Sequence, residues 1–235
     1  MVKEKLKNRI ALITGASRGI GAAVAKRFAA EGTHVILVAR TVGGLEEVDD
    51  AIKKSGGSAT LVPLDLREEE KIDQLAGLVN ERFGRLDILV GNAGTLGVLS
   101  PLPHVPPKKW EDTISLNLTS NFRLIRAFDP LLKKSDSGRV IFVTSGVAQG
   151  TFPYWGPYAV SKAGLEALAK TYAGECENTN IRVNIIDPGE VRTNMRAQAM
   201  PGENPESLPL PEEITDRFVE LAAAAYNKNG RRVAA

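Results

Sequence analysis

Three side chains in the second half of the sequence have the chemistry to move a proton. Tyr158 and Lys162 are four residues apart, so both lie on one face if this segment is helical. A free tyrosine has a pKa of about 10, and a nearby cation favours tyrosinate and lowers that pKa. Ser145 could hydrogen-bond a substrate oxygen and steady the charge that develops on it. A chance amphipathic pair and a serine that merely ends a strand are the alternatives.

A glycine-bearing segment, residues 14–21 (TGASRGIG), offers a second kind of chemistry. Gly15, Gly19 and Gly21 allow a tight turn, close approach of the backbone to a pyrophosphate, and N–H groups at a helix N-terminus that face negative charge. No Lys-Ser/Thr pair follows the glycines, so the segment is not a Walker P-loop. An ordinary strand-to-helix turn is the alternative, but the position in the first strand–helix unit favours a nucleotide site.

Alternating strands and helices must position these groups. Apolar runs predict six strands, each followed by a turn. These are residues 9–14, 34–39, 59–64, 86–90, 139–144 and 181–186. Helical spacing covers residues 20–30, 45–54, 68–83, 110–132 and 158–176. Because the strands are apolar throughout, both sheet faces should be buried. The predicted fold is α/β, a doubly wound, Rossmann-type parallel sheet with helices on both faces.

The length of 235 residues fits a single domain over residues 1–235. Residues 195–211 contain four prolines and are interpreted as a substrate-loop insertion in that domain.

Composition excludes several classes of function. The net charge of +2 shows no basic excess of the kind that nucleic-acid binders carry. Cys176 is the only cysteine, so an intramolecular disulfide and a cysteine-based zinc cluster are excluded. Only two histidines occur, which excludes a multi-histidine metal site, and no metal is expected. The charged N-terminus and the lack of a long apolar run argue against a signal peptide and a membrane span. We expect a cytoplasmic protein.

Taken in order, the motifs resemble those of the short-chain dehydrogenase/reductase family. The matching features are G-x-x-x-G-x-G at residues 15–21, Asn92-Ala93-Gly94, Asn117, Ser145, Tyr158-x-x-x-Lys162 and Pro188-Gly189. The resemblance covers about residues 6–200, and the length matches the single-domain NAD(P)-dependent branch. Two features depart from the family: Gly91 stands where a second asparagine is common, and the chain stops soon after Asn229-Gly230, so the family's last strand should be truncated or absent.

The resemblance implies site residues. The catalytic set would be Asn117, Ser145, Tyr158 and Lys162, with Asn117 holding a water of the proton relay and Lys162 also holding the nicotinamide ribose. Thr193 and the backbone near Val191 would contact the nicotinamide carboxamide, although Thr193 could also cap a helix. The full set of cofactor contacts implied is Gly15, Ser17, Arg18, Gly19, Ile20, Gly21, Arg40, Asp65, Leu66, Asn92, Ala93, Gly94, Tyr158, Lys162, Pro188, Gly189, Val191 and Thr193.

The second strand should end at Ala39 and Arg40, where an acidic residue would bind the ribose hydroxyls of NAD. Arg18 could reach the same place from the glycine segment. Two guanidinium groups suit a 2′-phosphate through charge-assisted hydrogen bonds, so NADP(H) is favoured. If both arginines are solvated surface residues, NAD(H) is the alternative.

These features predict an oxidoreductase that transfers a hydride between NADP(H) and a small carbonyl or alcohol substrate. A dinucleotide-binding regulator or scaffold with the same fold and little turnover is the alternative, and a sugar-nucleotide epimerase would need a second substrate domain. Segments 95–104, 146–155 and 192–211 should border the substrate. Phe152, Tyr154 and Trp155 would form an apolar wall there, or else be core or dimer contacts. The resemblance also implies a homo-oligomer, dimer or tetramer, formed through helices 110–132 and 158–176.

Overall fold

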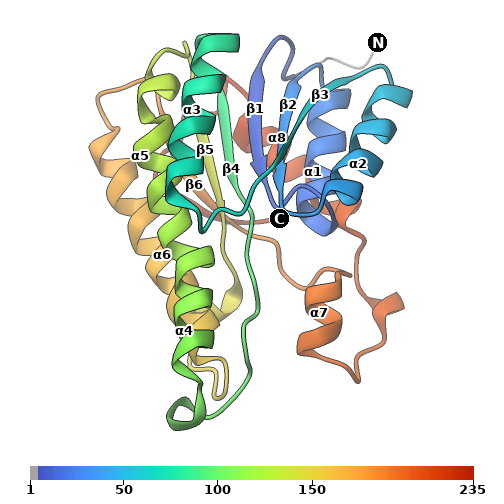
Figure 1. Ribbon diagram of the computed structural model, residues 1–235, viewed down its shortest axis with the longest axis vertical. Coiled ribbons are helices and arrows are strands. Elements are labelled where there is room, and N and C mark those ends of the chain that lie inside the picture. Colours follow the sequence, from blue (N-terminus) through green and yellow to red (C-terminus); the bar gives the residue numbers. More distant parts are fainter. Residues whose placement is uncertain (1–4) are drawn as a thin grey trace.

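The structure, a computed structural model, describes residues 5–235. In this part of the chain, parallel strands form one sheet in the order β3-β2-β1-β4-β5-β6-β7 (Figure 1). The strands are β1 Ile10–Thr14, β2 His34–Ala39, β3 Ser58–Pro63, β4 Ile88–Gly91, β5 Arg139–Val143, β6 Arg182–Asp187 and β7 Arg232–Ala234. The order reverses between β1 and β4, which is the topological switch point where such sheets bind ligands.

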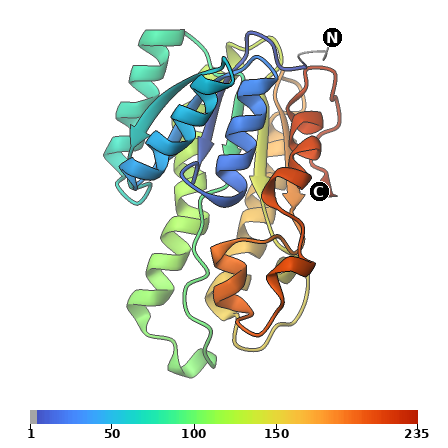
Figure 2. The same cartoon turned by 90° about the vertical axis from the view of Figure 1, so that its right-hand side faces the viewer.

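Helices cover both faces of this sheet, as Figures 1 and 2 show. The helices are α1 Gly19–Ala30, α2 Val42–Lys54, α3 Glu69–Phe83, α4 Pro107–Ile114, α5 Ser120–Lys133, α6 Gly156–Glu175, α7 Asn194–Ala199 and α8 Thr215–Ala222. One apolar core joins α1, α2 and α8 to the sheet, and a second core joins α3, α5 and α6 to the opposite face. The predicted doubly wound parallel sheet is confirmed.

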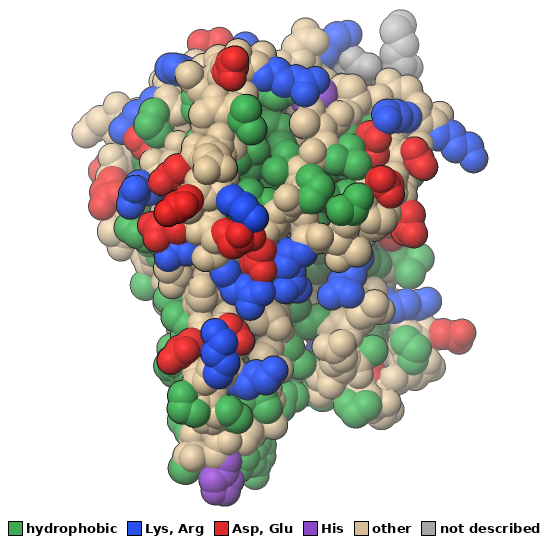
Figure 3. Space-filling model, viewed as in Figure 1, with side chains coloured by type: hydrophobic (Ala, Val, Ile, Leu, Met, Phe, Trp, Pro, Cys, Tyr) green, Lys and Arg blue, Asp and Glu red, His purple; other side chains and the backbone are tan. Residues whose placement is uncertain are grey.

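Short turns of helix connect the larger elements. The 3₁₀ turns are Leu102–His104, Gly146–Gln149, Pro205–Ser207 and Pro211–Ile214. The last two belong to the chain that follows α7: Pro205–Ser207 lies with α7 apart from the sheet at one end of the molecule (Figure 2), whereas Ile214 of the last turn packs into the core beside α1. In the space-filling view this end is hollowed between two lobes, with basic side chains at the inner end of the hollow (Figure 3).

The six predicted strands are all present, with ends that differ by one or two residues. The structure adds β7, a strand of three residues that pairs in parallel with β6. Two asparagines hold it there. Asn229 Oδ1 accepts a hydrogen bond from the Val183 amide at 2.8 Å, and Asn184 contacts the backbone of residues 228 and 231. The last strand is therefore short, and it is present.

The predicted helical pattern over residues 110–132 is helical throughout, although it is not one regular α-helix. The helix starts earlier, at Pro107, and a π-helical turn, Ser115–Thr119, separates α4 from α5. The Asn117 carbonyl accepts a hydrogen bond from the Asn121 side chain at 2.8 Å, and the Asn117 amide turns away to bond Thr95. These side-chain bonds accompany an extra residue in the turn, as is common where helices carry functional groups.

Candidate active site

The main cleft lies at the carboxyl ends of the central strands. It encloses a cavity of about 570 Å³, and its walls come from the turns that follow β1, β2, β4, β5 and β6, together with α7. Every residue that the sequence analysis assigned to the cofactor lines this cavity except Gly21. Ser145, Tyr158 and Lys162 also line it, whereas Asn117 lies behind its wall. The structure therefore brings together residues that are up to 178 positions apart in the sequence, from Gly15 to Thr193.

The glycine turn is built so that a side chain could not be accommodated. Gly15 has a φ of 65°, and a Cβ on it would lie 2.9 Å from Asn92 Nδ2. A Cβ on Gly21 would lie 2.3 Å from the Gly15 carbonyl oxygen, so Gly21 acts by close packing beneath the turn. The Asn92 amide in turn donates to the Thr14 carbonyl at 2.8 Å.

This turn leads into the N-terminus of α1. Arg18 is the N-cap residue, and its side chain makes no capping hydrogen bond, so the first N–H groups of this 12-residue helix face the cleft without a side-chain partner. Such a helix end favours a negatively charged group. The bare backbone and the open helix N-terminus fit the diphosphate of a dinucleotide.

Basic side chains gather at the end of the cleft beside β2 and β3. Arg67 holds Asp65 with an Nη2–Oδ2 distance of 2.6 Å, and these hydrogen bonds keep the pKa of the Asp65 carboxyl below its usual value. Arg40 approaches the same carboxylate only to 4.0 Å, and its side chain is 59% exposed. Because Asp65 is already paired with Arg67, Arg40 is left available together with Arg18 for an anionic ligand. The arrangement fits a 2′-phosphate.

The three side chains predicted to move a proton, Ser145, Tyr158 and Lys162, line the other end of the cleft. Ser145 follows β5, and its side chain lines the cavity together with Tyr158 on α6. Lys162 lies one turn further along α6, with its Nζ 5.8 Å from the centre of the Tyr158 ring. The same Nζ donates to the Val143 carbonyl oxygen at 2.7 Å. The predicted placement of Tyr158 and Lys162 on one helical face is seen directly.

Burial moves both pKa values of this pair toward the uncharged forms. Burial raises the pKa of Tyr158, the Ser145 hydrogen bond works against that rise, and the negative charge of Asp187 adds to it. Burial lowers the pKa of Lys162 to about 8. From the sequence, Lys162 is expected to lower the pKa of Tyr158, but the net shift is upward: desolvation by burial is its largest cause, and the Lys162 ammonium donates to the Val143 carbonyl.

Asn117 is fully buried and acts on the cleft wall from behind. Its Oδ1 accepts from the Thr95 amide at 2.8 Å, and its Nδ2 donates to the Thr95 carbonyl at 2.9 Å and to Ser161 Oγ at 3.0 Å. Ser161 Oγ donates to the Tyr158 carbonyl at 2.7 Å. Asn117 thus fastens the segment after β4 to the first turn of α6.

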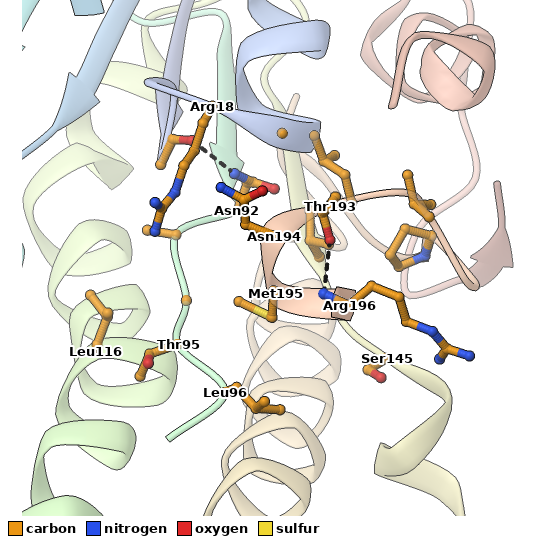
Figure 4. A pocket seen from close by; sticks show the side chains of 18 of the residues that line it. Arg18, Asn92, Thr95, Leu96, Leu116, Ser145, Thr193, Asn194, Met195 and Arg196 are labelled. Atoms are coloured by element: carbon orange, nitrogen blue, oxygen red, sulfur yellow. Dashed lines mark hydrogen bonds between the residues drawn. The ribbon is translucent and has the colours of Figure 1, made fainter. Parts of the chain in front are cut away.

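The wall around Tyr158 is apolar. Leu96, Val147 and Tyr158 form a buried cluster, and Trp155 and Met195 pack against it. Figure 4 shows Leu96, on the segment after β4, beside Met195 of α7. Of the three aromatic residues predicted for this wall only Trp155 lines the cavity, whereas Phe152 and Tyr154 are 43% and 61% exposed. Met195 was missed, because one methionine in a proline-bearing segment gives no periodic signal.

Helix α7 closes one side of the cleft and is held by charged groups. Thr193 lines the cavity and also caps α7, since its Oγ1 accepts from the Arg196 amide at 3.2 Å, so both predicted roles of its position are compatible (Figure 4). The Arg196 guanidinium binds Glu203 through two contacts of 2.6 Å and Glu190 at 2.9 Å.

No helix within residues 5–235 has the length and apolar character needed to cross a bilayer.

Comparison with known proteins places this geometry in context. Residues 9–204 match the family model for short chain dehydrogenases. The uncharacterized oxidoreductase YciK of Escherichia coli K12 is 37% identical over 222 residues, which cover 93% of this chain and 88% of YciK.

Solved structures agree over nearly the whole length. One described as a short chain dehydrogenase, from Pseudomonas syringae, has a TM-score of 0.96 and 40% identity and covers 99% of this chain and 96% of its own. Another, from Shigella flexneri 2a, was solved in complex with NADP; it has a TM-score of 0.95 and 36% identity and covers 99% of this chain and 98% of its own.

Proposed function

The chain belongs to the short-chain dehydrogenase family, and from that premise we propose that it is an NADP(H)-dependent oxidoreductase that interconverts an apolar carbonyl compound and its alcohol. The observation that carries the proposal is that Ser145, Tyr158 and Lys162 together line one end of a cleft whose other end fits a dinucleotide.

In the proposed reaction Tyr158 donates its phenolic proton to the carbonyl oxygen during reduction and takes it back during oxidation. Ser145 donates a hydrogen bond to the same oxygen and steadies its developing charge. The Lys162 ammonium stabilises the tyrosinate that remains after the proton has left. The nicotinamide, when bound, supplies or accepts the hydride. Asn117 contributes by fixing the segment that faces this site.

The preference for NADP(H) is supported by the basic end of the cleft and by the NADP complex of the Shigella relative. Arg18 and Arg40 are proposed to bind the 2′-phosphate. Ser17, which precedes Arg18, is proposed to contact the part of the nucleotide next to that phosphate. We expect Arg40→Ser to weaken NADPH binding by about tenfold and to leave NADH binding within a factor of about two, because only NADPH carries the extra phosphate. Titrations of both nucleotides by protein fluorescence measure this, and equal losses for the two would contradict the assignment.

The apolar cluster around Tyr158 supports a substrate with an apolar body and no charged group next to its carbonyl. We propose residues 195–211 as the segment that covers this substrate, since α7 supplies Met195 and Ala199 to the cluster. A substrate anion would find Arg196 already paired with two glutamates.

A screen tests the proposed activity. Uncharged ketones and aldehydes of increasing apolar size are incubated with NADPH, and its oxidation is followed by absorbance. Tyr158→Phe should reduce kcat by about 10²–10⁴-fold and bind NADPH as the wild type does. Tyr154→Phe, an exposed tyrosine four residues earlier, is the control and should keep full activity. Full turnover by Tyr158→Phe would refute the mechanism. If the wild type binds NADPH but turns over no carbonyl compound, the alternative of a dinucleotide-binding regulator or scaffold is favoured.

A further inference from the structure

A buried carboxylate lies directly behind the catalytic group. Glu166 is on α6, one turn after Lys162, and only 4% of it is exposed. Its Oε1 accepts from Thr144 Oγ1 at 2.9 Å, and its Oε2 accepts from Gln149 Nε2 at 3.3 Å. Thr144 and Gln149 stand on either side of Ser145 in the sequence, so Glu166 ties down the chain around the serine from the side opposite the substrate.

Arg232 of β7 completes this arrangement. Its Nε donates to Glu166 Oε1 at 2.9 Å, and its Nη2 donates to Asp187 Oδ2 at 2.8 Å. The same Nη2 lies 3.5 Å from the Ser145 carbonyl oxygen. One guanidinium therefore contacts α6, the end of β6 and the catalytic serine, although β7 is only three residues long.

Asp187 carries the contact on to the cofactor side of the cleft. Its Oδ1 accepts a hydrogen bond from the Gly189 amide at 3.1 Å. Gly189 has a φ of 68°, and the turn it forms with Pro188 lines the cavity. If Asp187 moved, this turn would lose the side-chain bond that orients it.

The charges around Tyr158 depend on the same arginine. Near the phenol are Lys162 from its own helix, Ser145 after β5, and Asp187 at the end of β6, whose negative charge disfavours tyrosinate. Arg232 neutralises Asp187 and Glu166 together. Lys170 reaches Glu166 only at 3.8 Å and from the exposed side, so it is a weaker partner.

We propose that Arg232, acting through Glu166 and Asp187, is a positioning residue that holds Ser145 and the Pro188–Gly189 turn in place and shields Tyr158 from the charge of Asp187. The inference rests on the proposed function for its effect on turnover, but its effect on the cofactor turn can be measured without turnover. It assigns a role in the active site to β7, which lies outside the cleft wall.

Three variants test the proposal in the full-length chain. Arg232→Met keeps the length of the side chain and removes its charge. Arg232→Lys keeps the charge and loses the two-pronged geometry that binds two carboxylates at once. Arg231→Met is the matched control, because Arg231 is the preceding residue of the same type and is exposed. For each variant, NADPH affinity is measured by fluorescence titration, and kcat, KM and the pH dependence of alcohol oxidation by absorbance.

Arg232→Met should lower kcat by about 10–100-fold and weaken NADPH binding by about 3–10-fold, with a smaller change in the substrate KM. The apparent pKa of the rate of oxidation should rise, because Asp187 then acts on Tyr158 without a neutralising cation. Arg232→Lys should keep the wild-type position on the pH axis and recover part of kcat. Arg231→Met should match the wild type in every measurement.

Wild-type kcat, pH profile and NADPH affinity in Arg232→Met would overturn the proposal. So would a loss of activity that Arg231→Met shares, or a loss in Arg232→Met without any shift in the pH profile or in NADPH affinity, since a merely structural residue would behave in that way. If Arg232→Met fails to fold, wild-type behaviour of Arg232→Lys in kcat and NADPH affinity would also overturn it. If the wild type turns over no carbonyl compound, the proposed function fails, while the NADPH titrations still decide the role of Arg232.

Discussion

At the scale of single residues, Tyr158 and Lys162, the proposed catalytic pair, are held in an environment that disfavours charge on both. Lys162 is 3% exposed and Tyr158 8%, and the pKa of the lysine falls while that of the tyrosine rises. A group whose pKa is shifted by burial reports a cost that the folded state bears in keeping it charged. Burying Lys162 and Tyr158 therefore lowers the stability of the folded state, and it leaves both side chains poised to gain or lose a proton.

The Lys162 shift gives a prediction about stability against pH. The pKa of Lys162 is about 8 in the folded state, below its value of about 10.4 in the unfolded chain. At pH values below both pKa values, the folded state buries a charged lysine. Between the two pKa values, Lys162 is protonated in the unfolded chain and neutral in the folded one, so the free energy of unfolding of the wild type rises with pH through this window. Lys162→Met should therefore raise the free energy of unfolding at pH 7 by about 1–2 kcal/mol, after the loss of the bond to Val143, and should abolish turnover.

Urea unfolding at pH 7 and above the unfolded-state pKa of lysine measures this effect. The advantage of Lys162→Met should shrink at the higher pH, where the wild-type lysine is neutral in both states. Lys170→Met, an exposed lysine two turns along α6, serves as the control and should show no comparable gain. A variant less stable than the wild type at pH 7 would show that the buried ammonium is favourable in place.

At the scale of elements, the short helix α7 and the short strand β7 are both tied to their neighbours by charged side chains. Helix α7 has six residues, far fewer than an isolated helix needs to be stable. Arg196 of α7 contacts Glu203, whose side chain is 25% exposed, and Glu190, whose side chain is 65% exposed. Since α7 carries Met195 and Ala199 against the substrate region, these ion pairs set the position of one wall of the cleft.

Arg196→Met tests that dependence. Loss of the ion pairs should loosen α7, raise the substrate KM by on the order of tenfold and change the melting temperature little, because α7 contributes little to the core. Steady-state kinetics with a substrate from the carbonyl screen give the KM. Arg217→Met, which removes an ion pair on α8 away from the cleft, should leave the KM unaltered. A KM that is unchanged in Arg196→Met would show that α7 does not shape substrate binding.

At the scale of the whole molecule, the two ends of the strands have different tasks. The carboxyl ends carry the cleft, and the amino ends carry two buried arginines, Arg9 and Arg139, that bind the C-terminus of α8. Arg9 Nη1 donates to the Ala222 carbonyl at 2.6 Å, and Arg139 donates to the Ala223 and Ala224 carbonyls at 3.2 and 2.6 Å. Cations suit a helix C-terminus, where the carbonyl groups have no partner within the helix.

Arg139→Met should therefore destabilise the fold without disturbing the chemistry. The carbonyl groups of Ala223 and Ala224, just after α8, lose their donors, so the free energy of unfolding should fall by about 1–3 kcal/mol, while the affinity for NADPH measured below the melting temperature stays at its wild-type value. Arg85→Met, at the same edge but with a side chain that is 43% exposed, should cost less than about 1 kcal/mol. A fall in NADPH affinity with unchanged stability would contradict this division between the two ends.

The homo-oligomer stays a prediction at this scale. Phe122 on α5 and Val160 on α6 are about half exposed, at 50% and 47%, on the helices that the family resemblance assigns to the interface.

Features that depend on short stretches of chain could be predicted from the sequence. The four-residue spacing of Tyr158 and Lys162, the glycine turn and the apolar strands depend on local geometry, so the helical face, the position of the turn and the parallel sheet followed directly. The π-helical turn also has a local feature in the sequence, since Asn117 and Asn121 are four residues apart and form a hydrogen bond. The contact of Asn117 with Thr95, 22 residues earlier in the chain, could be seen only in the structure.

The tertiary structure alone decided how distant charges meet. Glu166 and Arg232 are 66 residues apart, and no periodicity or motif joins them. A Cβ on residue 91 would lie 2.4 Å from Asn121 Oδ1, so a side chain does not fit there. This packing explains why Gly91 stands where a second asparagine is common in the family. The direction of the Tyr158 pKa also emerged only here. A pKa depends on burial and on every charge nearby, and both are set by how the folded elements pack and not by the order of residues along the chain.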